Sequence, residues 1–183
     1  TKWTAPDIEK AKQLVEESGT KGQEVTIIAE DTAVSKAIGT YLQSVLTEIG
    51  YKASVKPISP NIQFTYIQNT NNKVQISLSQ WYQDYSAASN FLNVLFGCGS
   101  FQEGSDSSIN IAGFCNEAVE AKMKEAFALS ATDQEAANKI WAEVDKMVVD
   151  EAAAAPLFTP KHIDFVSKRL GNFQFNAQFY WMV

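Results

Sequence analysis

Three aromatic residues and one carboxylate lie within five positions of the stretch SQWYQDYSAAS. They are Trp81, Tyr82, Asp84 and Tyr85. They follow a short segment that alternates between apolar and polar residues, and α/β proteins commonly hold ligands beyond the carboxyl ends of strands. A carboxylate between aromatic rings can receive a desolvated cation, because the charge-assisted hydrogen bond offsets the lost hydration and the ring faces attract the charge. The pattern is therefore compatible with a ligand site.

Each of these residues also has a structural explanation. Taken alone, Asp84 is typical of a helix cap or of a surface position after a strand. Trp81 fits a core residue beneath the loop equally well. If the strand continued, Tyr82 and Tyr85 would point to opposite faces, one toward a ligand and one toward the core. The residues themselves do not decide between these readings.

Candidates for enzymatic chemistry are few. Glu103 and Asp106 could join Asp84 as a carboxylate pair for glycoside hydrolysis, but nothing in the sequence sets their separation. The single histidine, His162, lies in the alternating stretch TPKHIDFVSKRL, which predicts a strand at residues 162–167. We interpret it as an ordinary strand residue. No metal site and no cofactor is predicted.

Length and charge narrow the class of protein. A chain of 183 residues is long enough for one domain or one large lobe, and we expect residues 1–183 to form a single lobe. The net charge of −6 and the absence of a basic run disfavour nucleic acid as a partner. No apolar run approaches the roughly 18 residues of a membrane span. The chain begins at Thr1, which indicates a processed protein or a piece of a longer one.

Hydrophobic periodicity predicts an α/β order of elements in the first half. A helix over residues 4–18 would be capped by Thr4, with Asp7 three positions later. A strand at 24–29, a helix at 31–49 and a strand at 51–58 form a β-α-β unit, whose strands should be parallel. Residues 60–73 are compatible with a short helix.

The second half continues the interleaved pattern. Residues 74–81 alternate as a strand, and Asn90, Phe91 and Leu92, with Leu95 and Phe96, have the spacing of an amphipathic helix, which makes them structural. Two further helices are predicted. Asn116 caps the first, Thr132 and Glu135 form a capping box for the second, and Pro156 ends it.

Five strings, spread in order over nearly the whole chain, resemble the C-terminal lobe of the family 5 extracellular solute-binding proteins, the oligopeptide- and dipeptide-binding components of ABC importers. They are DIEKAKQLVEESG (7–19), VSKAIGTYLQSVLTEIGYKASVKPI (34–58), SQWYQDYSAASNFLNVLFG (79–97), FCNEAVEAKMKEA (114–126) and APLFTPKHIDFVSKRLGNF (155–173).

The resemblance implies a fold. It is one lobe of a type II periplasmic-binding-protein fold, with a mixed sheet flanked by helices. Family members close two lobes over a ligand, so the resemblance also implies that the N-terminal lobe is missing from this chain.

The resemblance also implies roles for particular residues. The family's Trp-x-x-Asp-Tyr segment falls on Trp81, Asp84 and Tyr85. In peptide-binding members the aspartate pairs with the α-ammonium group of the peptide, and the tryptophan lines the adjacent pocket. After this segment many members have a proline-containing turn, where this chain has residues 86–89, Ser-Ala-Ala-Ser.

The resemblance implies that the protein is exported. In an oxidising compartment we expect Cys98 and Cys115 to form a disulfide rather than two buried thiols. A bond closing a loop of this size would stabilise the fold by about 3 kcal/mol.

The function expected from the resemblance is capture of a small peptide or related solute for the permease of an ABC importer. The protein would act outside the cytoplasm, as a cell-surface lipoprotein or in the periplasm, by binding rather than catalysis. Two alternatives stay open. One is an oligosaccharide-binding lobe of the same architecture, since aromatic residues also suit sugars. The other is a hydrolase that uses the carboxylates named above.

Overall fold

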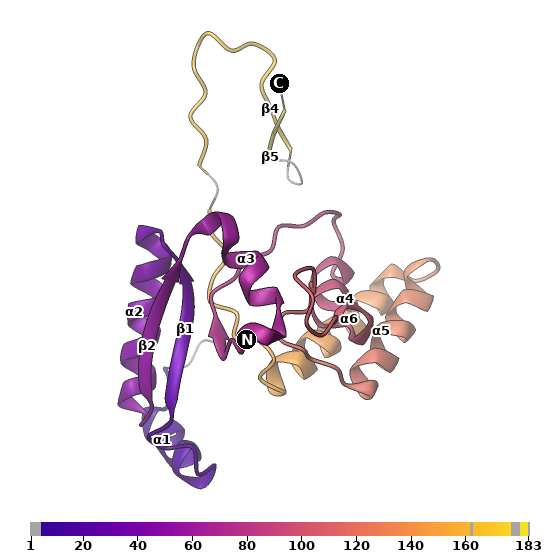
Figure 1. The fold of residues 1–183 in the computed structure, drawn as a ribbon. Coiled ribbons are helices and arrows are strands. Elements are labelled where there is room, and N and C mark those ends of the chain that lie inside the picture. Colours follow the sequence, from indigo (N-terminus) through magenta and orange to yellow (C-terminus); the bar gives the residue numbers. More distant parts are fainter. Residues whose placement is uncertain (1–4, 162, 177–179, 183) are drawn as a thin grey trace. The chain divides into compact units, whose positions relative to one another are not determined.

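The computed structural model describes residues 5–161, 163–176 and 180–182, which divide into two compact units. Unit 1 holds the residues up to Gln80 together with Glu103–Ser107. Unit 2 holds Trp81–Gln102 and the residues from Ser108 onward. Figure 1 labels the α-helices of both and most of the strands.

A parallel three-stranded sheet organises unit 1. Its strands are β1 (Glu24–Glu30), β2 (Lys52–Ile58) and β3 (Ile76–Ser77), in the order β2-β1-β3. The register of β1 against β2 runs from Glu24 opposite Lys52 to Glu30 opposite Ile58. Helix α2 (Ala33–Glu48) connects these two strands, so the predicted β-α-β unit is confirmed.

Helices cover both faces of this sheet. Figure 1 shows α2 on one side and α3 (Pro60–Gln68) on the other. Neighbouring side chains of a strand point to opposite faces, and Ile27, Ile28 and Ala29 of β1 are nevertheless all buried. A strand buried on both faces is typical of a parallel sheet.

The first helix, α1 (Ile8–Glu17), begins later than the sequence predicts. Asp7 is its N-cap, and the Asp7 side chain accepts from the backbone N–H of Lys10 at 2.9 Å. The predicted cap, Thr4, lies outside the described residues. The helix is followed by Gly19, which adopts a φ of +69° that disfavours residues with a Cβ.

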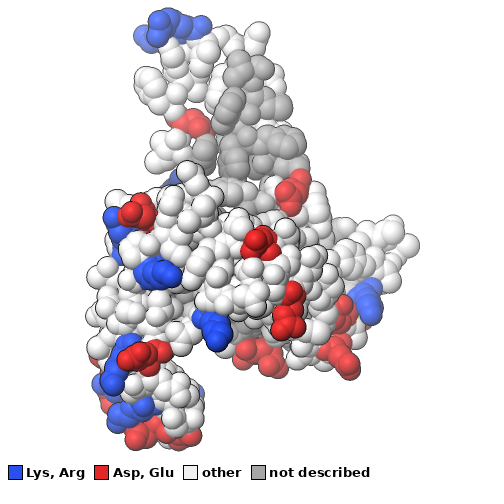
Figure 2. Space-filling model, in the orientation of Figure 1, with Lys and Arg blue, Asp and Glu red and all other residues white. Residues whose placement is uncertain are grey.

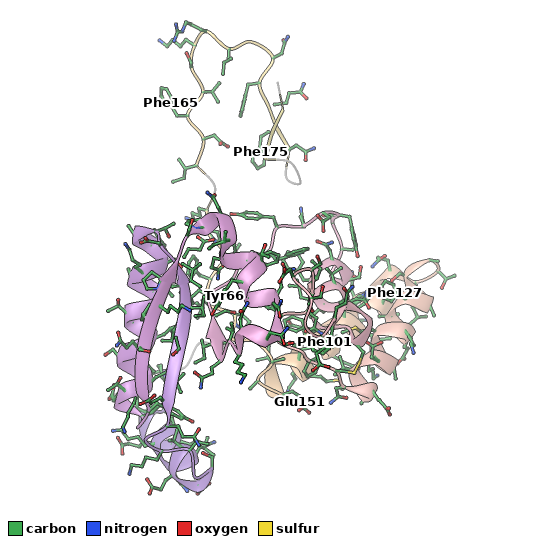
Figure 3. All side chains as sticks on the ribbon, viewed as in Figure 1. Tyr66, Phe101, Phe127, Glu151, Phe165 and Phe175 are labelled. Carbon is green, nitrogen blue, oxygen red and sulfur yellow. A yellow bond between two sulfur atoms is a disulfide. The ribbon has the colours of Figure 1, made fainter. Side chains whose placement is uncertain are left out.

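Three helices form the core of unit 2. They are α4 (Ser89–Phe96), α5 (Glu117–Ser130) and α6 (Gln134–Asp150). The Phe127 ring of α5 meets the Trp141 ring of α6 edge to face, with centroids 5.1 Å apart. Figure 3 labels Phe127 on its helix. The buried core residues are Leu92, Val119, Met123, Ala126, Ala137, Ile140, Trp141, Val144 and Val148.

The ends of α5 and α6 confirm one prediction and correct two. Asn116 caps α5 as predicted, accepting from the backbone N–H groups of the first turn. The cap of α6 is Asp133, not Thr132, and its side chain accepts from Ala136 N at 2.9 Å. Helix α6 ends at Asp150, well before Pro156, so the proline does not end it.

Two predicted strands are corrected. Of residues 74–81 only Ile76 and Ser77 form strand β3, because only those two residues pair with β1. Residues 163–167 are not a strand, and the alternating side chains Ile163 and Phe165 are 89% and 96% exposed. Periodicity indicates an extended segment, but a strand also needs a neighbour for its backbone groups. His162 lies outside the described residues.

The remaining elements are short. Single 3₁₀ turns lie at Thr70–Asn72 and Cys98–Ser100. Strands β4 (Gln174–Asn176) and β5 (Tyr180–Met182) form a separate antiparallel pair. Among the helices in the described ranges, none is both long and apolar enough to cross a membrane.

Candidate functional site

One buried asparagine ties the predicted site residues together. The Asn90 side chain is fully buried in the first turn of α4. Its Oδ1 accepts from the indole Nε1–H of Trp81 at 3.2 Å and from the backbone N–H of Asp84 at 2.9 Å. Its Nδ2 donates to Asp84 Oδ2 at 3.1 Å. Asn90 therefore contacts both the aromatic ring and the carboxylate that the sequence singles out.

The chemistry of the partners sets the orientation of the Asn90 amide. An indole N–H and a backbone N–H can only donate, so the atom that faces them must be the carbonyl oxygen. An amide oxygen has two lone pairs, and these two donors can occupy both. The carboxylate of Asp84 then faces the NH₂ group, which donates to it. The hydrogen bonds thus favour one amide orientation over its flipped alternative.

The structure rules out one reading of Asp84, the helix cap. The N-cap of α4 is Ala88, and no side chain caps that helix. The Asp84 residue is exposed, whereas Trp81 is half-buried. Asp84 therefore presents a carboxylate at the surface of unit 2 while Asn90 holds it from behind.

The two tyrosines do not alternate between a core and a surface. The strand ends at Ser77, residues 78–83 are irregular and residues 84–87 form bends, so the alternation of a strand does not reach Tyr82 or Tyr85. Their rings are 53% and 43% exposed. Tyr85 OH accepts from Ser89 Oγ at 3.3 Å, a contact that links the loop to the start of α4.

The Cys98–Cys115 disulfide is present, as predicted. Glu120 Oε1 accepts from the backbone N–H of Cys98 at 2.7 Å and fixes the entry to the closed loop. Inside the loop, the buried side chain of Asn110 donates to Gly97 O and Phe114 O and accepts from Phe114 N. Asn110 in the disulfide loop is thus, like Asn90 before it, a fully buried asparagine whose amide is hydrogen-bonded.

The carboxylates considered for hydrolysis do not gather in one unit. Asp84 belongs to unit 2, whereas Glu103 and Asp106 belong to unit 1. Asp106 Oδ1 accepts from Asn69 Nδ2 at 2.7 Å, and Gly104 N donates to Thr70 Oγ1 at 2.9 Å. The first bond gives Asp106 a structural role, and both bonds hold the loop of residues 103–107. The described ranges contain no cluster of three or more side chains suited to a metal ion.

Unit 2 also has a shallow hollow of about 460 Å³ between α4 and α6. Neither Trp81 nor Asp84 lines it. The residues that do are Ala88, Phe91, Leu92, Asn138, Trp141, Ala142 and Asp145. On the face in Figure 2, the acidic and basic side chains of the described residues are interspersed and form no continuous basic surface.

Comparison with known proteins identifies the family. Residues 1–103 match the bacterial extracellular solute-binding proteins, family 5 Middle. This match spans more than half of the chain, so the chain belongs to the family of bacterial extracellular solute-binding proteins, family 5. The resemblance inferred from the five strings is confirmed. No curated protein sequence is similar enough to count as a relative.

Solved structures show the same fold. Similar structures include the ABC transporter-associated periplasmic binding protein DppA from Helicobacter pylori in complex with the peptide STSA (19% identity, TM-score 0.70), covering 80% of this chain and 28% of that one. A dipeptide binding protein from Pseudoalteromonas sp. SM9913 in complex with Met-Leu (22% identity, TM-score 0.68) covers 80% and 29%. The α/β class, with a sheet flanked by helices in a periplasmic-binding-protein fold, is confirmed.

A third similar structure carries a different ligand. It is the solute-binding protein MoaA in complex with mannopinic acid from A. tumefaciens R10, with 17% identity and a TM-score of 0.66, covering 80% of this chain and 29% of that one. The chain therefore spans less than a third of the length of these three proteins. The family consists of binding proteins.

Sequence reasoning missed the role of Asn90. The helical spacing around it explains why it reads as a structural residue, and it is indeed buried. One signal was available. A polar amide within the apolar run SNFLNVLF must find hydrogen-bond partners once it is buried. What those partners are depends on how the preceding loop folds back.

Proposed function

We propose that this chain is the ligand-binding lobe of an extracytoplasmic receptor that captures a peptide-like solute for an ABC importer. The single observation that carries the proposal is that Trp81 and Asp84 are both hydrogen-bonded to the Asn90 side chain in a member of this family. Asp84 would meet the α-ammonium group of the peptide, and Trp81 would form the wall beside it.

The proposed chemistry follows from desolvation. A peptide ammonium entering a closed site loses its water, which is costly unless a carboxylate accepts its hydrogen bonds. An exposed carboxylate held from behind needs little rearrangement to do so, and low conformational cost favours affinity. The mechanism is binding, and no chemical step is assigned to any residue.

The test uses the complete protein that carries this sequence. It is offered short peptides from a casein digest, and retained peptides are identified by native mass spectrometry. We expect retention of peptides with free amino termini and its loss after acetylation of the digest. Asp84→Asn should weaken binding roughly thirtyfold or more, since it removes the carboxylate that would pair with the peptide ammonium once the bound peptide is enclosed.

Asp106→Asn is the matched control. It removes another loop carboxylate, one that belongs to unit 1 and accepts from Asn69. Its peptide affinity should equal that of the unaltered protein. Undiminished retention by Asp84→Asn, or equal retention of acetylated peptides, would refute the proposed pairing.

A sugar or sugar-derived ligand is the second candidate. The observation in its favour is the similar structure in complex with mannopinic acid, which shows that this fold does not restrict the ligand to peptides. If this candidate is right, the purified protein retains no peptide, and binding of a sugar panel survives Asp84→Asn. Two peptide-bound similar structures favour the first candidate.

We further propose that a second lobe completes the receptor and covers the C-terminal segment, of which the structure describes residues 155–161 and 163–176. Several large exposed apolar side chains lie along this segment, and a concentration of exposed apolar side chains commonly indicates an interface. Phe165 and Phe175 can be seen in Figure 3. The exposed residues are Leu157, Phe158, Ile163, Phe165, Leu170 and Phe175.

Hydrogen exchange tests the second lobe. Amides of residues 163–176 should exchange slowly in the complete protein and quickly in the isolated chain of 183 residues. Equal exchange in both would contradict the proposed lobe. Cell-surface or periplasmic placement and cooperation with a permease complete the proposal, and fractionation of cells producing the complete protein tests the location.

A further inference from the structure

The geometry points to Asn90 as the positioning residue of the ligand site, the group that sets the direction of the Asp84 carboxylate and the Trp81 ring together. The inference rests on the proposed function, because it assumes that Asp84 and Trp81 receive the ligand. It assigns to Asn90 a role toward the ligand that acts wholly through these two neighbours.

Burial decides how Asn90 acts. Its side chain has no exposed surface, so it cannot contact a ligand that approaches from solvent. Asp84, by contrast, is exposed and Trp81 is half-buried. The position of Asn90 on α4 adds rigidity, because α4 belongs to the core cluster through Leu92. Sites held by packed elements keep their geometry better than sites held by loops alone.

The hydrogen bonds show what is positioned. Asp84 is held at two points, its backbone N–H by Asn90 Oδ1 and its carboxylate by Asn90 Nδ2. Two bonds to one residue restrict both the place of its Cα and the rotation of its side chain. Trp81 is held through Nε1 by the same Oδ1 atom. The ring and the carboxylate therefore share Asn90 as a common partner, and removal of its amide should alter the geometry of both.

Asn90→Ala removes all three bonds at once, and Asn90→Asp removes a single donor. The aspartate can keep an acceptor oxygen toward Trp81 and Asp84 N, but it places an oxygen where Nδ2 now lies 3.1 Å from Asp84 Oδ2. Two carboxylates at that distance repel each other. A buried carboxylate also lowers stability whichever role Asn90 has, so the two roles are separated by the Trp81 and Asp84 signals and by peptide affinity, not by the loss of stability.

Asn110→Ala is the matched control. Asn110 is, like Asn90, a fully buried asparagine of unit 2, and it also makes three side-chain bonds to its neighbours. Its partners belong to the disulfide loop rather than to the proposed site. A substitution there should lower stability much as Asn90→Ala does, without altering the ligand site.

The experiment combines a structural and a binding readout on the complete protein. In nitrogen-edited NMR spectra, Asn90→Ala should shift the indole N–H resonance of Trp81 and speed hydrogen exchange at the Asp84 amide, while Asn110→Ala leaves both unchanged. Casein-digest peptides with free amino termini should bind at least roughly tenfold more weakly to Asn90→Ala and to Asn90→Asp, the loss expected for hydrogen bonds to a charged group.

The outcomes separate the inference from the function on which it rests. If Asp84→Asn abolishes peptide binding while both Asn90 variants bind normally, the positioning role is overturned and the function stands. If Asp84→Asn has no effect, the function fails, and the Trp81 and Asp84 resonances still report whether Asn90 holds them. If Asn90→Ala does not fold, Asn90→Asp and Trp81→Phe carry the test, and unchanged binding in both overturns it.

Discussion

Gly39 of α2 lies so close to Val55 of β2 that a Cβ at position 39 would stand 3.1 Å from Val55 Cγ1. The same Cβ would lie 3.5 Å from Ala29 Cβ on β1. The missing side chain lets the helix backbone approach both strands of the β-α-β unit. Close packing against the two strands therefore favours glycine at position 39, although helix propensity alone favours alanine there.

This packing predicts coupling between Gly39→Ala and Val55→Ala. In the unaltered chain the new methyl group crowds Val55, at a cost of about 1–3 kcal/mol that opposes the helix-propensity gain of about 1 kcal/mol. With Val55→Ala the crowding disappears, and the substitution at 39 should become clearly more favourable. Urea unfolding of both single variants and the double variant measures this, and additive effects would contradict it.

The disulfide predicts a dependence of stability on redox state. Cys98 and Cys115 are 17 positions apart, and opening a loop of this size should cost about 3 kcal/mol of unfolding free energy. Urea unfolding with and without a reductant measures the loss. The double variant Cys98→Ser with Cys115→Ser should have the unfolding free energy of the reduced chain, and the reductant should not change it. A loss below about 1 kcal/mol would fall short of the loop-closure expectation.

The start of α6 predicts unequal effects at two neighbouring residues. Asp133 caps the helix through Ala136 N, so Asp133→Ala should cost about 1 kcal/mol. Thr132 only donates from an exposed hydroxyl to Leu129 O at 3.4 Å, so Thr132→Ala should cost less. Thermal unfolding of the two variants compares them. A larger loss of stability in Thr132→Ala than in Asp133→Ala would instead support Thr132 as the cap, as the sequence predicts.

An exposed ion pair predicts a titration effect. Lys122 Nζ of α5 lies 2.9 Å from Glu143 Oε2 of α6 and 3.3 Å from Glu125 Oε2. The hydrogen bond that Lys122 donates to Glu143, followed by the one that it donates to Glu125, raises the pKa of Lys122 above its ordinary value of 10.5. Because the folded pKa is the higher one, this stabilisation is full below the ordinary value and disappears as the pH rises through the folded pKa.

Glu143→Gln should therefore lower the pKa of Lys122, as measured by NMR titration of its ammonium group. The thermal midpoint should fall slightly at neutral pH, and the difference should shrink at high salt because exposed pairs are screened. At a pH above the folded pKa, variant and unaltered chain should unfold alike. An identical Lys122 titration in both would show that the ion pair between Lys122 and Glu143 does not form in solution.

Local patterns were sufficient for much of the fold. The apolar spacing within α2 and the Asn116 cap of α5 are readable from neighbouring residues, since they depend on contacts within one element or one turn. The β-α-β order is readable because two apolar strands joined by a helix are constrained to pair in parallel. The Trp-x-x-Asp-Tyr segment was likewise visible, because its residue types and spacing are themselves the signal. The disulfide partners needed only the knowledge that an exported chain favours paired cysteines.

Other features depended on which segments meet. Alternation alone did not make a strand of residues 163–167, because a strand exists only where a neighbour pairs with its backbone. The alternation at Tyr82 and Tyr85 failed for the same reason, since pairing with β1 stops at Ser77. By itself, the sequence determined that Trp81 and Asp84 occur together near a strand. The tertiary structure decided that they share the amide of Asn90, because only the fold of the loop over α4 brings a buried amide to both.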